Sequence, residues 1–509
     1  MLSKKELLET VERDANALAY DERVHLVETI LTDLESSVSS PEEENEKTRE
    51  LQVLKVLGRQ VNGSEALFSK RGITVLATVG GLLNPKEVTD TPSSQEALKC
   101  LANCILLKET TKVWVDELEC IDTCCYILQS PDLSMDTQFL LCRILFFMTV
   151  NRHDLVKRLM EIDVAQAIQR ISQQHVDVLK SKQPYDSKSP INPVSVVSEA
   201  LKLLFNLMLV DSRNRSKEEA SVSAEQFQGC LVPIFEILFL IPYPEPLPLS
   251  PPHSHAIHAM MQYPQAVMVP VWQAQPQLTS LYGSQDEGRE LVLDLFIGAL
   301  DRSVHYLIPN EDPDETASSV PEHHVDAILP PMILVLRNMA EAIPEMNKAM
   351  GELLLPREGD RVKPVNKGAS LAAYMIRLMT SAMLQQTRNA VCELLYVLCD
   401  EDATKFTQQV GYGNAVGFLV NRGISLDPPQ ESGGAAEDIN PITGQYISAE
   451  QQEGPSLADM TDEEKEREAE RLFVLFERLK KTGIVDVENP IAKAMQEGKF
   501  EDKPSDEED

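Results

Sequence analysis

The strongest constraint on the fold is a series of segments that are apolar on nearly every side at helical spacing. These segments lie at 51–57, 97–107, 138–149, 200–210, 291–300, 329–340, 371–379 and 391–398. A helix that is apolar all round must be packed between neighbouring helices. Several of the segments are separated by roughly 40 to 60 residues, which is typical of armadillo or HEAT repeats. The sequence therefore predicts an all-α fold, an armadillo/HEAT-like α-solenoid over residues 1–425.

Composition and charge exclude several classes of protein. Aromatic residues make up 5% of the 509 residues and apolar residues 43%, which favours packed helices over sheets. The formal net charge of −33 argues against nucleic-acid binding, because phosphates would be repelled. We expect no signal peptide and no integral membrane segment, since the longest apolar runs are too short to span a bilayer. The nine cysteines, including the pairs Cys100/Cys104 and Cys120/Cys124, are predicted to be buried thiols.

The apolar pattern is interrupted by loops and changes near residue 423. Polar or proline-rich stretches at 180–193, 242–252 and 309–321 are predicted to be surface loops. Residues 426–460 are predicted to form a flexible linker, and 484–509 an acidic disordered tail. Between them, 461–483 is expected to hold one amphipathic helix, capped by Thr461. Its apolar stripe consists of Leu472, Phe473, Leu475, Phe476 and Leu479.

Signatures of catalytic chemistry are weak throughout the chain. A phosphate-binding glycine loop followed by lysine is missing from the sequence, so we predict no nucleotide-binding site of that kind. His253, His255 and His258 form the densest histidine cluster, but no cysteine or acidic partner completes a zinc site. They are expected to be solvent-facing residues at a helix start. The sequence predicts no cofactor, no metal and no catalytic residue.

Three asparagines occupy a recurrent position on the apolar helices. Asn103, Asn206 and Asn338 each follow a core leucine by two residues. In an armadillo-like stack such positions line the concave groove, where amides can hydrogen-bond a bound segment. Alternatively, each asparagine hydrogen-bonds within its own repeat, and both roles can coexist.

Two basic residues lie on the first apolar helix. Lys55 and Arg59 are one helical turn apart in 51–59. Cations on an apolar helix are costly unless they meet carboxylates or water. They are predicted either to meet carboxylates in the groove or to be ordinary charges on a solvated edge.

A glycine corner follows the last apolar helix. Gly411 and Gly413 bracket Tyr412, which gives a backbone free to adopt positive φ. Asn414 is predicted to cap a helix over 415–420. The sequence thus predicts helix, corner and helix, with a buried tyrosine at the bend.

This helix followed by Gly-Tyr-Gly-Asn-Ala closely resembles the synembryn family of exchange factors and folding chaperones for heterotrimeric G-protein α subunits. The segments 199–206, 249–258, 439–444 and 460–472 extend the resemblance along the chain. It implies the same solenoid fold. It also implies that the C-terminal helix and carboxylate of Gα enter the concave groove, facing Lys55, Arg59 and Asn103. Where the family has a denser basic cluster, this chain keeps only Lys348 within 342–348.

The resemblance also bears on the C-terminal region. It implies that the late helix contacts the nucleotide-binding domain of Gα; a terminal cap on the solenoid is the alternative. Thr461 and Ser505 each precede acidic residues and are candidate sites for an acid-directed kinase, although Thr461 suits a helix cap better. Animal members carry an acidic phosphorylated segment after the corner, but here Ser432 precedes Gly-Gly-Ala-Ala. This departure indicates a fungal-type or otherwise divergent branch.

The resemblance implies a mechanism without covalent chemistry. An exchange factor binds nucleotide-free Gα better than the GDP-bound form, and the same contacts would shelter nascent Gα. The expected partner is a Gα subunit, and the protein is expected to be monomeric alone and cytoplasmic, with recruitment to the plasma membrane through Gα. The alternative is an α-solenoid adaptor that binds a linear peptide without exchange activity.

Overall fold

The computed structural model describes residues 3–14, 16–36, 41–84, 88–213, 224–274, 285–310, 312–315, 323–424, 439–440, 442–449 and 461. These residues form helices joined by loops, and the one β-type pairing among them is an isolated bridge between Ile439 and Tyr446. The chain divides into two compact units. The first comprises 1–307 and 323–349, and the second comprises 308–322 and 350–509.

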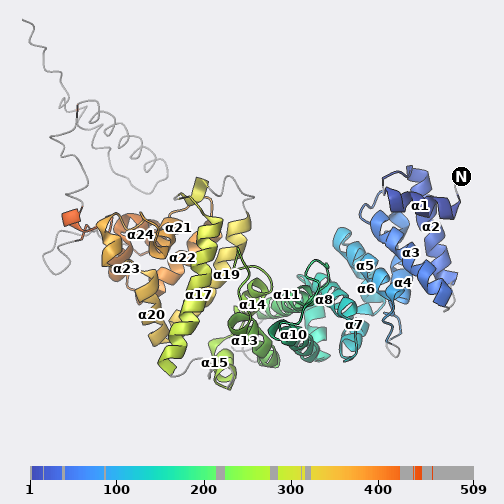
Figure 1. Cartoon of the computed structure of the whole chain (residues 1–509), viewed down its shortest axis with the longest axis horizontal. Coiled ribbons are helices and arrows are strands. Elements are labelled where there is room, and N and C mark those ends of the chain that lie inside the picture. Colours follow the sequence, from blue (N-terminus) through green and yellow to red (C-terminus); the bar gives the residue numbers. More distant parts are fainter. Residues whose placement is uncertain are drawn as a thin grey trace, which may run out of the picture. The chain divides into compact units, whose positions relative to one another are not determined.

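The first unit is built from a long succession of helices (Figure 1). They are α1 (Lys4–Arg13), α2 (Tyr20–Ser36), α3 (Pro41–Leu57), η1 (Glu65–Phe68), α4 (Lys70–Val79), α5 (Pro92–Leu107), α6 (Thr111–Glu117), α7 (Cys120–Leu128), α8 (Met135–Thr149), α9 (His153–Glu161), α10 (Val164–Lys180), α11 (Pro193–Ser212), η2 (Gln228–Cys230), α13 (Leu231–Leu240), α14 (His253–Met260), α15 (Gln265–Gln273), α17 (Gln285–Leu307) and α19 (His323–Ala342). Helix α20 (Pro344–Leu354) begins in the first unit and ends in the second.

One set of helices forms the spine of the first unit. Helix α3 packs on α5, α5 on α8, α8 on α11, α11 on α14, and α14 on α19. All but α14 contain apolar segments predicted from the sequence, and core leucines such as Leu101 and Leu204 are fully buried. Burying a leucine contributes about 1.5–3 kcal/mol, so this sequential packing is a large part of the core. We call α3, α5, α8 and α11 the inner helices. The stack confirms the all-α, armadillo-like architecture.

Capping residues mark the first turn of several of these helices. Thr91 caps α5 and Asn192 caps α11, each with a serine three residues on completing a reciprocal capping box and a proline in the first turn. Asp90 also links two helix starts. Its carboxylate accepts hydrogen bonds from the Ser134 backbone N–H at 2.6 Å, the Thr137 hydroxyl at 2.6 Å and the Gln95 amide at 2.9 Å. Caps therefore fix both the helix boundaries and the spacing between inner helices.

Helix α11 is long and apolar enough to cross a membrane by length and composition alone. However, 72% of its apolar stretch is buried within the protein, where it packs on α8, α10 and α14. These are the properties of a core helix.

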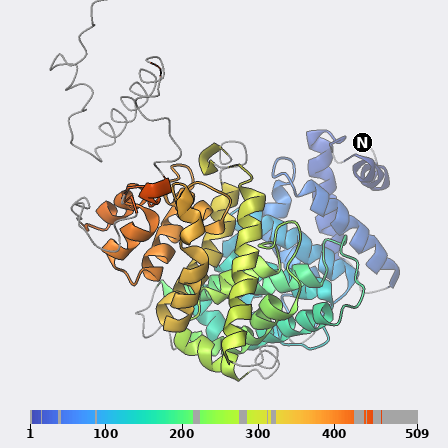
Figure 2. The ribbon, with the colours of Figure 1, turned by 60° about the vertical axis from the view of Figure 1, so that its left-hand side comes forward.

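The second unit contains η3 (Glu358–Val362), α21 (Leu371–Met379), α22 (Gln385–Leu398), α23 (Ala403–Val410) and α24 (Tyr412–Asn421). The last four appear together in orange in Figure 2. Helix α21 packs on α22, and α23 on α24. Phe406 is buried between the Tyr396 and Phe418 rings, with centroids 5.5 and 5.7 Å away. This aromatic cluster joins the last three helices of the unit.

The glycine corner lies between α23 and α24, with two differences from the prediction. Gly411 has φ of 82°, as expected, but α24 begins at Tyr412, so Gly413 and Asn414 are inside the helix. The Asn414 side chain is therefore not the cap; its Nδ2 donates to the Val410 carbonyl at 2.7 Å. Tyr412 is half-buried rather than buried. One glycine with positive φ turns the chain without a separate capping residue.

Part of the predicted linker is folded. Residues 439–440 and 442–449 form a turn that hydrogen-bonds to the body of the second unit, for example from the Gly413 N–H to the Ile442 carbonyl at 3.1 Å. The prediction of a linker was therefore wrong for this stretch. The predicted helix at 461–483 and the tail at 484–509 lie outside the described residues, apart from exposed Thr461. The remaining domain boundaries stay predictions.

Candidate functional site

The inner helices each carry a cation at a partly exposed position. Lys55 lies on α3, Lys99 on α5, Arg143 on α8 and Lys202 on α11. Their side chains are 26% to 36% exposed, although α5, α8 and α11 are otherwise mostly buried. We call these four residues the cation row. Because successive inner helices pack on one another, the row runs along the spine of the first unit.

Buried glutamates hold the cation row in place. Glu96 is 7% exposed, and its carboxylate accepts from Lys55 Nζ at 2.5 Å and from Lys99 Nζ at 3.0 Å. Glu199 is 3% exposed and accepts from Arg143 Nη2 at 2.7 Å and from Lys202 Nζ. Burial raises the pKa of Glu96, but hydrogen bonds from the two lysines more than offset this and hold it below its ordinary value. Each carboxylate thus bridges two neighbouring helices. Lys99 also lies 3.6 Å from Asp136 Oδ1, so the four cations meet three carboxylates.

One helical turn further on, the same helices carry a second row. It consists of half-buried Asn103 on α5, Phe146 on α8 and Phe205 on α11, and it starts at exposed Arg59, which lies just beyond the C-terminal end of α3. Lys202 Nζ lies 5.6 Å from the centroid of the Phe146 ring, a cation–π contact. The chemistry therefore changes from polar near α3 to aromatic near α11. We call the cation row and this second row together the basic–aromatic face.

Three of the predicted site residues lie on this face. Lys55 and Asn103 lie on α3 and α5, which pack on each other, and Lys55 is paired with Glu96. Arg59 was predicted to lie on the same helix as Lys55. This was wrong, because α3 ends at Leu57 and Gly58 follows. Its exposed side chain makes no ion pair with another described residue, so its charge is available to a partner. The Asn103 side chain likewise makes no hydrogen bond within the described part of the chain.

The other predicted asparagines have local partners. Asn206 is 7% exposed and its Nδ2 donates to Thr149 Oγ1, the last residue of α8, at 2.8 Å. Asn338 accepts from Arg337 Nη1 at 3.2 Å and is half-buried on α19. The Asn206 amide thus bonds the preceding inner helix α8, which is neither a residue of its own helix nor a bound segment. Lys348 is exposed on α20 and makes no ion pair within the described residues.

The sequence prediction missed Lys99, Arg143, Lys202 and both phenylalanines. A signal for two of them was present, because Glu96-Ala-Leu-Lys-Cys-Leu-Ala-Asn103 and Glu199-Ala-Leu-Lys-Leu-Leu-Phe-Asn206 share the pattern Glu-Ala-Leu-Lys-x-Leu-x-Asn. In both copies the glutamate is buried and the lysine three residues later is part of the cation row. A repeated glutamate and lysine on an apolar helix thus marked the exposed edge of each inner helix. Arg143 and Phe146 carry no such motif.

The described residues offer no group of metal ligands and no activated nucleophile. Three or more histidine, cysteine or acidic side chains do not gather into a metal site in the described ranges. His253 is buried and its Nε2 lies 3.1 Å from the Ile241 carbonyl, so the prediction that it faces solvent was wrong. All nine cysteines are buried free thiols, as predicted. Burial raises the pKa of the Cys104 and Cys120 thiols to about 12, which leaves them protonated and unreactive.

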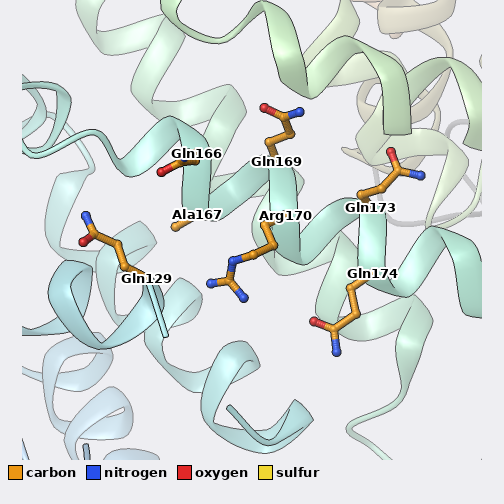
Figure 3. A pocket seen from close by; sticks show the side chains of 7 residues that line it. All are labelled: Gln129, Gln166, Ala167, Gln169, Arg170, Gln173 and Gln174. Carbon is orange, nitrogen blue, oxygen red and sulfur yellow. The ribbon is translucent and has the colours of Figure 1, made fainter. Parts of the chain in front are cut away.

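A cavity of about 630 Å³ lies on another surface, along α10 (Figure 3). Its lining consists of Gln129, Gln166, Ala167, Gln169, Arg170, Gln173 and Gln174. Several of these side chains bind neighbouring helices; the Gln129 Nε2 donates to the Ile162 carbonyl at 3.2 Å, and Gln173 Nε2 to Glu236 Oε2 at 2.6 Å. Amides and one guanidinium can form hydrogen bonds but supply no general base or nucleophile.

The fold and the face define a class: a helical-repeat protein whose stacked inner helices present a basic and aromatic surface. The comparisons give the family. The family described as guanine nucleotide exchange factor synembryn matches residues 50–499, and the chain belongs to it.

Curated relatives are similar over most of their length. A synembryn-like chaperone of Schizosaccharomyces pombe is 25% identical over 89% of this chain and 82% of its own. The chaperone Ric-8A of Bos taurus is 24% identical over 86% of this chain and 81% of its own. A solved structure from work on the interaction between cadherin and beta-catenin covers 99% of this chain and 93% of its own, with 12% identity and a TM-score of 0.43.

Proposed function

We propose that this protein is a guanine nucleotide exchange factor and folding chaperone for heterotrimeric G-protein α subunits. The observation that supports it best is the basic–aromatic face in a member of the synembryn family. The C-terminal helix of Gα would lie along this face. Arg59 and Asn103 would receive its terminal carboxylate, because both side chains lack partners within the described residues. The apolar side of the bound helix would pack on Phe146 and Phe205.

The charges of the face suit an anionic chain end. Each glutamate of the face is shared between two cations, so the cation row keeps a net positive charge in a protein whose formal net charge is −33. The cations are also oriented before a partner arrives, which reduces the entropy lost on binding. Lys348 and Asn338 would extend the contact along the bound helix.

Exchange requires no reactive side chain in this mechanism. The face binds nucleotide-free Gα more tightly than GDP-bound Gα, and this difference weakens nucleotide binding by thermodynamic linkage. A thousandfold weakening corresponds to about 4 kcal/mol of differential binding. The predicted helix at 461–483, with Leu472, Phe473 and Phe476, would supply a second contact to the opened nucleotide domain. The same contacts would shelter nascent Gα in the cytoplasm, or at the plasma membrane when Gα is there.

The test combines an exchange assay with a matched pair of variants. Purified GDP-loaded Gα is mixed with the protein, and uptake of a fluorescent GTP analogue is followed. Arg59→Glu reverses a charge on the face; Lys157→Glu reverses a charge at an exposed position on α9, outside the face. We expect faster uptake with the natural protein and with Lys157→Glu, and at least tenfold weaker stimulation with Arg59→Glu. Binding without acceleration would instead support the adaptor function, and equal effects of the two variants would contradict a role for the face.

A further inference from the structure

The cavity along α10 is lined by five glutamines and one arginine, and the proposed function makes no use of it (Figure 3). Four of the glutamines lie on successive turns of α10, and Gln129 directly follows α7. None of the lining residues belongs to the basic–aromatic face, and α10 is not one of the inner helices. We call this site the glutamine pocket; its residues are Gln129, Gln166, Ala167, Gln169, Arg170, Gln173 and Gln174.

Three of the glutamines are held by one end of the amide, and the other end is open. The Gln129 Nε2 donates to a backbone carbonyl at 3.2 Å, and the Gln173 Nε2 donates to Glu236 Oε2 at 2.6 Å. The Gln174 Oε1 accepts from a buried glutamine of α8 at 3.2 Å. Within the described residues, the carbonyl oxygens of Gln129 and Gln173 and the amino group of Gln174 make no hydrogen bond. The pocket therefore presents oriented acceptors and a donor to a ligand.

A fourth glutamine is accommodated by a glycine of the neighbouring turn η2. A Cβ on Gly229 would lie 2.1 Å from Gln169 Oε1, so any side chain at position 229 would displace this amide. The clash would fall on the far end of a flexible side chain and would leave the backbone in place. Gln169 and the exposed Gln166 make no hydrogen bond within the part of the chain that the structure describes. Both amides are thus available to a ligand at both ends.

The charge of the pocket comes from a single cation. Arg170 donates from Nη2 to the Leu128 carbonyl, and its guanidinium forms no ion pair with a carboxylate of the described residues. A guanidinium has five N–H donors, so most of them remain open. Toward Gln173, the nearby carboxylates Asp177 and Glu236 share one lysine of α10, at 2.8 and 2.7 Å. An anionic group is therefore accepted at the Arg170 end and not at the Gln173 end.

We propose that the glutamine pocket binds an extended segment of a second partner protein, one that carries a single acidic side chain. A glutamine side chain ends in an amide, so it can donate to and accept from a peptide backbone. From Gln166 to Gln174 the helix rises about 12 Å, which an extended chain covers with about four residues. Arg170 pairs with the acidic side chain of the segment. The other residues of the segment are uncharged, because a chain with a formal net charge of −33 would repel a strongly acidic one.

A peptide array tests the pocket with the full-length protein. Blocked hexapeptides with one Asp or Glu among uncharged residues are displayed beside the same peptides with Asn or Gln, and labelled protein is applied. We expect acidic peptides to be retained and, in anisotropy titrations, to bind at least tenfold more tightly than their amide counterparts. Arg170→Gln should abolish this preference, whereas Lys157→Gln, at an exposed position of α9 outside the pocket, should keep it. Failure to find a peptide whose binding depends on Arg170 would overturn the proposal.

Two matched glycine variants test the amides without removing the cation. Gly229→Ala displaces the Gln169 amide and should weaken binding of the selected peptide several-fold. Gly359→Ala is the control, because an added Cβ there meets no atom within 4 Å, and it should leave binding unchanged. Gln166→Ala, at an exposed position, should also weaken binding several-fold with an unchanged Tm, which keeps the test valid if Arg170→Gln unfolds the protein. Full affinity in both Gly229→Ala and Gln166→Ala would contradict binding through the glutamines.

Further measurements distinguish this occupant from others. Peptides N-methylated on both sides of the acidic residue should bind at least fivefold more weakly, since the backbone can no longer donate there. Free glutarate that binds as tightly as the peptide would identify a small-anion site and overturn the proposal. A dimer in sedimentation that Arg170→Gln disperses would make a second copy of this chain the occupant, with the same consequence. Stimulation of nucleotide uptake by Gα should be unchanged in Arg170→Gln; its loss would assign the pocket to Gα and refute a second partner.

Discussion

Asn103 and Asn206 occupy the same position of the same sequence motif, and the structure predicts opposite consequences of replacing them by alanine. Asn206→Ala removes a buried hydrogen bond to Thr149 Oγ1. The Thr149 hydroxyl still donates to the Leu145 carbonyl at 2.7 Å, so only an acceptor site is left unpaired. We estimate a loss of about 1–2 kcal/mol from the hydrogen bond and the small cavity. The free energy of unfolding should fall by that amount.

Asn103→Ala should act on binding alone. Its half-buried side chain makes no hydrogen bond within the described residues, and alanine has the higher helix propensity, so stability should change by less than about 0.5 kcal/mol. A hydrogen bond to a terminal carboxylate is charge-assisted and contributes about 1.5–3 kcal/mol. Affinity for a peptide of the Gα C-terminal helix should therefore fall about 10- to 100-fold.

Two measurements on each variant decide between these predictions. Thermal unfolding followed by circular dichroism gives the stability, and fluorescence anisotropy with a labelled C-terminal peptide gives the affinity. Asn206→Ala should lower the Tm by about 1–3 °C and bind normally, whereas Asn103→Ala should keep its Tm and bind weakly. A stable Asn206→Ala protein that fails to bind, or an Asn103→Ala protein with full affinity, would refute this division of roles.

Three further predictions follow from the same structure. Burial raises the pKa of Asp90, but hydrogen bonds from Thr137, Gln95 and Ser134 outweigh it and hold the pKa below its ordinary value. The ionised Asp90 carboxylate therefore stabilises the fold above a pH of about 3.9, and this stabilisation is lost at lower pH. The stability of Asp90→Asn should depend less steeply on pH in that range than the stability of the natural protein, and parallel acid-unfolding curves would contradict this. Lys202→Ala should weaken peptide binding several-fold and reduce its dependence on salt concentration, as titrations at 50 and 300 mM salt would show; an unchanged salt dependence would exclude Lys202 from the contact. Because burial raises the pKa of thiols such as that of Cys104 to about 12, the folded protein should react with a thiol reagent only after denaturation, and rapid reaction of the native protein would contradict their burial.

Much of the architecture could be predicted from the sequence because helix formation here is governed by local patterns. The apolar segments are all helical in the structure and bury most of their leucines, as their periodicity required, although Leu106 and Leu107 at the end of α5 are exposed. The positive φ of Gly411 was predictable too, since glycine beside glycine in a break between helices favours such a turn. The start of α24 was missed because Asn414 satisfies the Val410 carbonyl from within the helix instead of capping it.

The candidate site was predictable only in part. Lys55, Arg59 and Asn103 were identified through the family resemblance, whereas Arg143 and Phe146 were not, because their exposure depends on how α8 packs between α5 and α11. The turn at 439–440 and 442–449 was mistaken for linker, since polar residues and a glycine look the same in the sequence whether a turn is free in solvent or bound to a distant part of the chain. Its partner Arg361 is 83 residues away from Gly444 in the sequence.

The sequence by itself determined that this chain forms stacked helices and that its thiols are buried, because apolar periodicity acts over a few residues. Tertiary structure alone decided which of two identical asparagines is buried against a neighbouring helix and which is open to a partner. It also decided which cations share a buried glutamate, and where the chain returns to the corner at Gly411. Those outcomes depend on residues that meet only when the helices pack, and no local pattern encodes which residue of another helix a given side chain will contact.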